Sequence, residues 1–261
     1  MRVLSGIFTT LFRPAKGVDS LGDALKWLWI PLVIILATSV VGKAIVATPM
    51  QSAATQAATD ATLKTQLEQM PEADRAQFEK DMGEGGALET VSTIANTAAI
   101  VFGVVGSLFA LLYIATFFFV AAKTWALPVK YTSLLSIAGL ALLPHTIRNV
   151  IQTVYMASTG VWLQHAGLGA LVAPKTLMTP PSVFYAILSQ IDLWVIWGVV
   201  ILFGALMSKV VGIEKKRAVA AVLAFVVITG VAQAVPTIVT GVFMGGSSGG
   251  TVTETPASET P

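Results

Sequence analysis

The sequence predicts an all-α, polytopic membrane protein with five transmembrane helices. Hydrophobic residues make up 55% of the 261 residues and charged residues only 11%, whereas about 25% of residues are charged in an average soluble domain. The charges also gather in short clusters between long apolar runs, which is how a bilayer partitions a chain. Because the chain has two histidines and no cysteine, disulfides, thiolate zinc sites and iron–sulfur clusters are excluded.

Five stretches are apolar over the length that a spanning helix requires, about 20 residues. We place the spans at residues 25–47, 91–122, 133–157, 184–211 and 218–244. The alternative for the first stretch is a cleaved signal peptide. Its leading segment of about 26 residues and its apolar run are both long for a signal peptide, which favours a span.

Lysine and arginine residues near the span ends predict an N-terminus on the inner side and a C-terminus on the outer side. They precede the first span, and they occupy the connections between spans two and three and between spans four and five: Arg2, Arg13, Lys16, Lys26, Lys123, Lys130, Lys209, Lys215, Lys216 and Arg217. These three regions fall on one side of the membrane if all five spans form. The outer side then holds segment 48–90, loop 158–183 and the C-terminal tail.

The N-terminal segment 1–24 carries apolar residues at helical spacing. In the first part these are Val3, Leu4, Ile7, Phe8, Leu11 and Phe12. The pattern predicts an amphipathic helix, either on the inner membrane surface or packed as a lid against the bundle. Pro14 can open a second short helix that places Val18, Leu21 and Leu25 on one face.

Segment 48–90 is the one sizeable polar region between the predicted spans. We predict a small helical hairpin that projects outward. Its first arm continues span one, and its second arm begins near Pro71. The hairpin is either a solvated connector or a docking surface for a membrane-protein partner. Residues 245–261 consist almost entirely of Gly, Ser, Thr, Pro and Glu, which predicts a disordered tail.

Arg148 and Asp192 are ionisable residues inside predicted spans three and four. Each lies about 12–14 Å below the outer boundary at about 1.5 Å per residue. A charge at that depth costs at least about 2–3 kcal/mol unless it is paired or hydrated. We therefore predict an ion pair between Arg148 and Asp192.

A polar stripe surrounds this pair in the third span. Its members lie at i, i+3, i+4 and i+7, on one helix face: His145, Arg148, Asn149 and Gln152. Asn96 and Gln233 add polar groups in spans two and five. The stripe and Asp192 form either a structural polar network or the site of a solute or proton carrier.

Small and basic residues supply two further candidates. Ala99, Gly103 and Ser107 form one small-residue row, and Gly204, Ser208 and Gly212 form another. Such rows allow close helix packing within the bundle or dimerisation. Lys215, Lys216 and Arg217 form a basic corner that either sets the topology or binds anionic lipid headgroups.

Three segments carry a family resemblance. They are LFRP at 11–14, KYTSLLSIAGLALLP at 130–144, and residues 197–218 with the basic turn GIEKKRA. Together they resemble the Yip-domain family, five-span membrane proteins named for their interaction with Ypt/Rab GTPases. The chain lacks the long soluble N-terminal region of eukaryotic members. The resemblance therefore implies a bacterial-type member in a bacterial cytoplasmic membrane.

The sequence carries no serine nucleophile elbow, phosphate-cradling glycine loop or metal-ligand cluster. We therefore expect no catalysis, cofactor or metal. The positive charges lie beside membrane segments, so nucleic acid is not an expected partner. The leading hypothesis is a non-enzymatic membrane scaffold or partner-binding subunit. The alternative is a small-solute or ion carrier that uses the polar stripe and Asp192.

Overall fold

The computed structural model describes residues 2–71, 86–163, 167–173, 183–189 and 191–245. All regular secondary structure in these residues is helical, as the sequence predicts. The elements in chain order are α1 (Arg2–Phe12), α2 (Pro14–Leu21), the short 3₁₀ helix η1 (Gly22–Lys26), α3 (Trp29–Gln69), α5 (Gly86–Thr124), α6 (Tyr131–Thr159), the 3₁₀ helix η2 (Gly167–Val172), α7 (Val183–Leu188), α8 (Leu193–Leu206) and α9 (Lys215–Gly245).

Within the described residues, three segments are long and apolar enough to cross a bilayer. They are Trp29–Ala57 in α3, Ile100–Thr124 in α5 and Tyr131–Thr159, the whole of α6. Helix α8 is equally apolar but has only 14 residues. At about 1.5 Å per residue it is about 21 Å long, less than the hydrocarbon thickness of about 30 Å. The chain is therefore an integral membrane protein with at least these three candidate spans.

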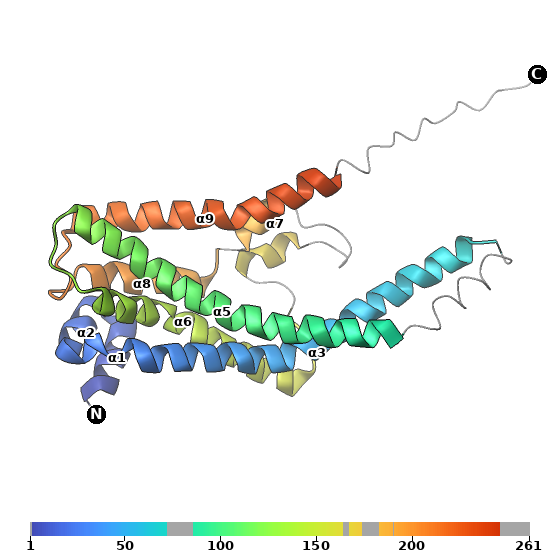
Figure 1. The fold of residues 1–261 in the computed structure, drawn as a ribbon, viewed down its shortest axis with the longest axis horizontal. Coiled ribbons are helices and arrows are strands. Elements are labelled where there is room, and N and C mark those ends of the chain that lie inside the picture. The colour runs from blue at the N-terminus through green and yellow to red at the C-terminus, as the bar shows by residue number, and fades with distance from the viewer. Residues whose placement is uncertain (1, 72–85, 164–166, 174–182, 190, 246–261) are drawn as a thin grey trace, which may run out of the picture.

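The long helices run side by side, and the segments rich in Lys and Arg gather at one end of the bundle (Figure 1). This end holds α1, α2 and η1, together with the turns that join α5 to α6 and α8 to α9. We call it the packed end. At the opposite end, the C-terminal part of α3 and the first turns of α5 extend beyond the other helices.

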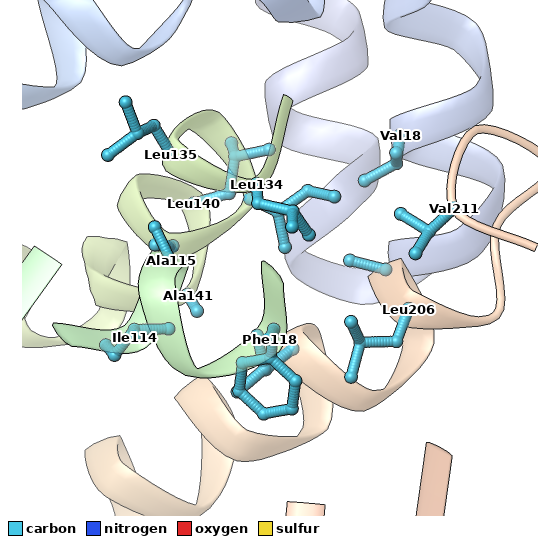
Figure 2. Close-up of a cluster of buried hydrophobic side chains, with 14 of the residues drawn as sticks. Val18, Ile114, Ala115, Phe118, Leu134, Leu135, Leu140, Ala141, Leu206 and Val211 are labelled. Carbon is cyan, nitrogen blue, oxygen red and sulfur yellow. The ribbon is translucent and has the colours of Figure 1, made fainter. Parts of the chain in front are cut away.

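The hydrophobic core lies at the packed end (Figure 2). Val18 of α2, Phe118 of α5, Leu134 of α6 and Leu206 of α8 are each at most 1% exposed. Val18, Leu21 and Leu25 all face this core, which confirms the face predicted for the second short helix. The core therefore ties the N-terminal segment to three of the long apolar helices.

Small residues permit the closest helix contacts. A Cβ added at Gly204 of α8 would lie 2.3 Å from Cγ of Pro14, and one at Gly103 of α5 would lie 3.0 Å from Val40 of α3. Ser208 is also buried. Gly103, Gly204 and Ser208 of the two predicted small-residue rows thus lie at packed positions, whereas Gly212 is exposed with nothing within 4 Å of an added Cβ. The side chain of Ala99 lies outside the described residues.

Helix α1 combines the two arrangements that its sequence leaves open. Ile7 and Leu11 pack against the core, and the indole Nε1 of Trp197 donates to the Leu11 carbonyl oxygen at 2.8 Å. Leu4 and Phe8 point outward and are 73% and 67% exposed. The helix is a lid on α8 that keeps an apolar outer face.

The predicted fourth span, 184–211, differs from the structure because it is not one continuous helix. Helix α7 ends at Leu188 and α8 begins at Leu193. Asp192 takes an extended conformation and caps α8, a position that aspartate prefers over a helix interior. The described residues between the two helices, Ser189, Ile191 and Asp192, are called the helix break; Gln190 lies outside the described residues.

The predicted outer segment is observed in part. Helix α3 continues to Gln69, so the first arm of the 48–90 hairpin runs on from the first span. The start of the second arm lies outside the described residues, apart from Pro71 itself, and α5 is already helical from Gly86. The predicted disordered tail also lies outside the described residues, from 246 onward.

Candidate functional site

The predicted ion pair is present at the helix break. Nη1 of Arg148 lies 2.8 Å from Oδ2 of Asp192, and the two side chains are 15% and 9% exposed. Arg148 lies about 26 Å along α6 from Tyr131, and Asp192 lies about 21 Å along α8 from Leu206. Both charged side chains are therefore buried among the helices and lie within the length of helix that crosses a bilayer. The pairing offsets the cost of placing either charge there alone.

The two carboxylate oxygens of Asp192 interact with two different groups. Its Oδ1 accepts from the backbone N–H of Trp194 at 3.2 Å, while its Oδ2 faces Arg148. The first contact caps α8 at the positive end of the helix dipole. The carboxylate thus joins α6 to the start of α8 and stabilises the helix break electrostatically.

Helix η2 packs against the helix break and meets its backbone groups. The N–H of Leu168 donates to the Ile191 carbonyl oxygen at 3.0 Å, and the N–H of Ile191 donates to the Leu188 carbonyl oxygen at 3.0 Å. Gly167 has a φ of +57°, a conformation in which glycine is favoured. A Cβ at Gly169 would lie 2.8 Å from Cβ of Ser189. Irregular backbone at membrane depth is tolerated only when it is covered in this way.

A cavity of about 690 Å³ lies beside the ion pair and is lined by residues of α5, α6, α7, α8, α9 and the helix break. We call it the polar cavity because His145 and Arg148 line it. The rest of its lining is mainly apolar, including Leu142, Ile187, Val199, Leu202, Phe225 and Val226. The cavity is partly open to the outside of the molecule.

The predicted polar stripe divides between lining and non-lining positions. His145 and Arg148 line the polar cavity, whereas Asn149 and Gln152 are half-buried on α6 and do not line it. Within the described residues, Nδ1 of His145 and Oε1 of Gln152 are buried and have no hydrogen-bond partner. The side chains of Asn96 and Gln233 lie outside the described residues. The site therefore holds polar groups whose hydrogen-bonding capacity is unmet.

Lys43 is a further charged residue near the site, and it is not among the site residues predicted from the sequence. It lies on α3, half-buried, and is close enough to Arg148 and His145 for their charges to interact. Lys43 is about 21 Å along α3 from Trp29, the depth of Asp192 along α8. Counting residues from the helix ends, which predicts the pairing of Arg148 with Asp192, also places Lys43 at a similar depth.

A comparison with protein families matches residues 8–235 to the family model described as the Yip1 domain. The chain belongs to the Yip1-domain family. The match covers most of the chain and includes α6, the helix break and α8. Comparison with curated proteins and with solved structures found no match.

In this Yip1-domain protein, α6 and α8 touch on the side of the polar cavity that faces the packed end. A Cβ added at Gly198 would lie 2.6 Å from the Ala141 carbonyl oxygen. Leu202, one turn further along α8, is 2% exposed. The packed core therefore closes the polar cavity toward this end.

The basic corner lies apart from the polar cavity, at the packed end. Lys215, Lys216 and Arg217 are all exposed at the start of α9. The guanidinium of Arg217 lies 5.9 Å from the Trp125 ring centre, and its Nε lies 3.9 Å from Oε2 of Glu214. All three cations face outward, an arrangement that suits contact with lipid headgroups. In the described residues no group of three or more His, Asp or Glu side chains can hold a metal ion.

Proposed function

We propose that this Yip1-domain protein crosses the bilayer five times, with its N-terminus inside and its C-terminus outside. In this topology α3, α5 and α6 are the first three passes. Helix α7, the helix break and α8 together form the fourth pass, and α9 is the fifth. The gathering of the Lys- and Arg-rich segments at the packed end supports the proposal, because such segments stay on the inner side. The proposed location is a bacterial cytoplasmic membrane.

Within that topology, we propose a non-enzymatic scaffold that binds a membrane-protein partner outside the bilayer. The observation that carries this proposal is the length of two helices. Helix α3 has 41 residues and α5 has 39, so each is about 60 Å long, roughly twice the hydrocarbon thickness. The C-terminal part of α3 and the first turns of α5 extend beyond the other helices and offer a helical surface to a partner (Figure 1).

The alternative, a small-solute or ion carrier, has weaker support. A carrier needs its polar site to be reached from both sides of the membrane in different states. The polar cavity is closed toward the packed end by the contact of Gly198 with Ala141 and by the buried Leu202. Both oxygens of the Asp192 carboxylate also have partners, because one pairs with Arg148 and the other accepts from the backbone N–H of Trp194. These contacts favour a structural role for the pair.

Cysteine labelling tests the topology, and the natural chain suits it because it has no cysteine. Lys64 and Lys216 are both exposed, on the C-terminal part of α3 and at the packed end. We expect a membrane-impermeant maleimide to label Lys64→Cys in intact cells and Lys216→Cys only after lysis. The reverse pattern would invert the proposed orientation, and equal labelling of both from outside would rule out an odd number of spans between them.

Site-specific photo-crosslinking tests the scaffold role. A crosslinking amino acid at Glu68, exposed on the C-terminal part of α3, should give one protein adduct of constant mass in native membranes. The matched control is Ile34, which is 61% exposed on the same helix within the span and should give lipid adducts only. Lipid adducts alone at both positions would contradict the scaffold proposal.

A further inference from the structure

The polar cavity has a composition that fits an amphipathic ligand. Its ionisable groups on α6, His145 and Arg148, lie together, and Tyr185, Ser189 and Thr229 add uncharged polar groups. Most of the remaining wall is apolar. A volume of about 690 Å³ lies within the range of small-molecule sites, roughly 300–1,000 Å³. The cavity can therefore hold a charged group together with part of a hydrocarbon chain.

The charges around the polar cavity do not balance. Arg148 lines the polar cavity, and Lys43 on α3, which does not line it, adds a second cation close enough to interact with Arg148. Asp192 is the one buried acidic residue in the described part of the chain. An unmatched charge at this depth is costly, so a further anion beside Arg148 is stabilised. The guanidinium has five N–H donors in a planar fork, a geometry that matches phosphate oxygens and leaves donors beyond the bond to Asp192.

The rim of the polar cavity indicates where the ligand comes from. Ile187 of α7, Ile191 of the helix break and Val226 of α9 all line the cavity and are 48%, 42% and 44% exposed. Large aliphatic side chains at the surface of a membrane protein contact lipid chains. The lining is thus continuous with the lipid-facing surface, which favours a ligand from the bilayer over a water-soluble anion.

We propose that the polar cavity binds an anionic phospholipid, with the phosphate against Arg148 and one acyl chain along the apolar wall. His145 adds a second polar contact near the headgroup, because its buried Nδ1 has no partner among the described residues. The ion pair with Asp192 then has a positioning role: it holds the guanidinium at the cavity wall. This site is separate from the exposed basic corner and does not depend on the scaffold role.

Native mass spectrometry of the full chain in mild detergent tests the proposal, with phosphatidylglycerol and phosphatidylcholine as probes. Both lipids carry the same phosphate, but phosphatidylcholine adds a trimethylammonium cation that would lie near Arg148 and Lys43. The wild type should therefore bind one phosphatidylglycerol about tenfold more tightly than phosphatidylcholine. An excess of inorganic phosphate should not displace the lipid. Displacement would identify a site for free anions and would overturn the lipid proposal, as would equal affinity for the two lipids.

Two variants locate the binding in the polar cavity. Val199→Phe fills the cavity and should abolish the preference, whereas Val200→Phe, on the 52% exposed neighbouring position, should keep it. The double variant Arg148→Gln with Asp192→Asn should bind both lipids equally. Helical content and gel filtration check folding, and Val226→Trp at the rim replaces Val199→Phe if that variant misfolds. Retention of the tenfold preference in a folded cavity-filling variant would overturn the site.

Discussion

At the packed end, polar groups bond to single, specific partners between tightly packed apolar side chains. The Ser136 hydroxyl donates to the Leu25 carbonyl oxygen, and the carboxylate of Asp19 accepts from the backbone N–H of Lys209. Beside the helix break, by contrast, the ionised side chains of Arg148 and Asp192 pair with each other. Helix α8 begins there, and the polar cavity lies next to the pair. Among the described residues, buried polar side-chain atoms without a partner occur in both regions: Ser208 Oγ at the packed end, and His145 Nδ1 and Gln152 Oε1 on α6. Of these three residues, only His145 lines the polar cavity.

This difference distinguishes the packed end, where tight packing fixes the helices, from the region of the polar cavity, which has space and hydrogen-bond donors for a ligand. Packed apolar contacts with satisfied polar groups fix one arrangement of helices. A charged cluster with surplus donors and adjoining space can accept a ligand at little cost to packing. We therefore expect mutations at the packed end to change stability, and mutations around the polar cavity to change stability through charge and binding through shape.

The largest expected effect comes from breaking the ion pair. Arg148→Ala leaves the Asp192 carboxylate buried without its partner, and loss of one partner of a buried pair costs about 3–5 kcal/mol. Thermal unfolding in detergent should detect this loss. Arg148→Gln with Asp192→Asn should recover most of it, because asparagine still caps α8 and no charge remains. If the single variant is as stable as the wild type, the pair does not hold this half of the bundle together.

An intermediate effect is expected from the closest contact at the packed end. Gly204→Val places a side chain where Pro14 Cγ is 2.3 Å from the added Cβ, so α2 must move away from α8. Overpacking of this kind costs typically about 1–3 kcal/mol. The matched control is Gly106→Val in α5, where an added Cβ meets nothing within 4 Å. Equal thermal midpoints for the two variants would contradict a tight α2–α8 contact.

The smallest effect is expected at an exposed pair on η1. The Lys26 ammonium hydrogen-bonds the Asp23 carboxylate and lowers the pKa of Asp23. A lowered pKa stabilises the fold above the unfolded pKa, and this contribution is lost as the pH falls through the folded pKa. Because Asp23 is 93% exposed, solvent screens the pair. Asp23→Asn should therefore leave the thermal midpoint unchanged at neutral and acidic pH, in contrast with Arg148→Ala.

The sequence by itself determined the features that depend on local composition and spacing. The all-α class and the apolar segments follow from the length of the hydrophobic runs, because the thickness of the bilayer sets how many apolar residues a spanning helix needs. The two N-terminal helices follow from apolar periodicity and Pro14. The pairing of Arg148 with Asp192 follows from residue counting, because a helix converts sequence distance into depth at a constant rise.

Only the tertiary structure decided the features that depend on contacts between distant segments. Ser189, Gln190 and Asp192 interrupt the apolar run in the sequence, but only the structure shows that η2 covers the helix break. There Leu168 and Gly169 contact Ile191 and Ser189, which are 20 or more positions later in the chain. The cavity exists because five helices leave space beside His145. Lys43 is brought near the site by the packing of α3 on α6. Periodicity and composition describe one segment at a time, whereas a cavity and its charge balance belong to several segments at once.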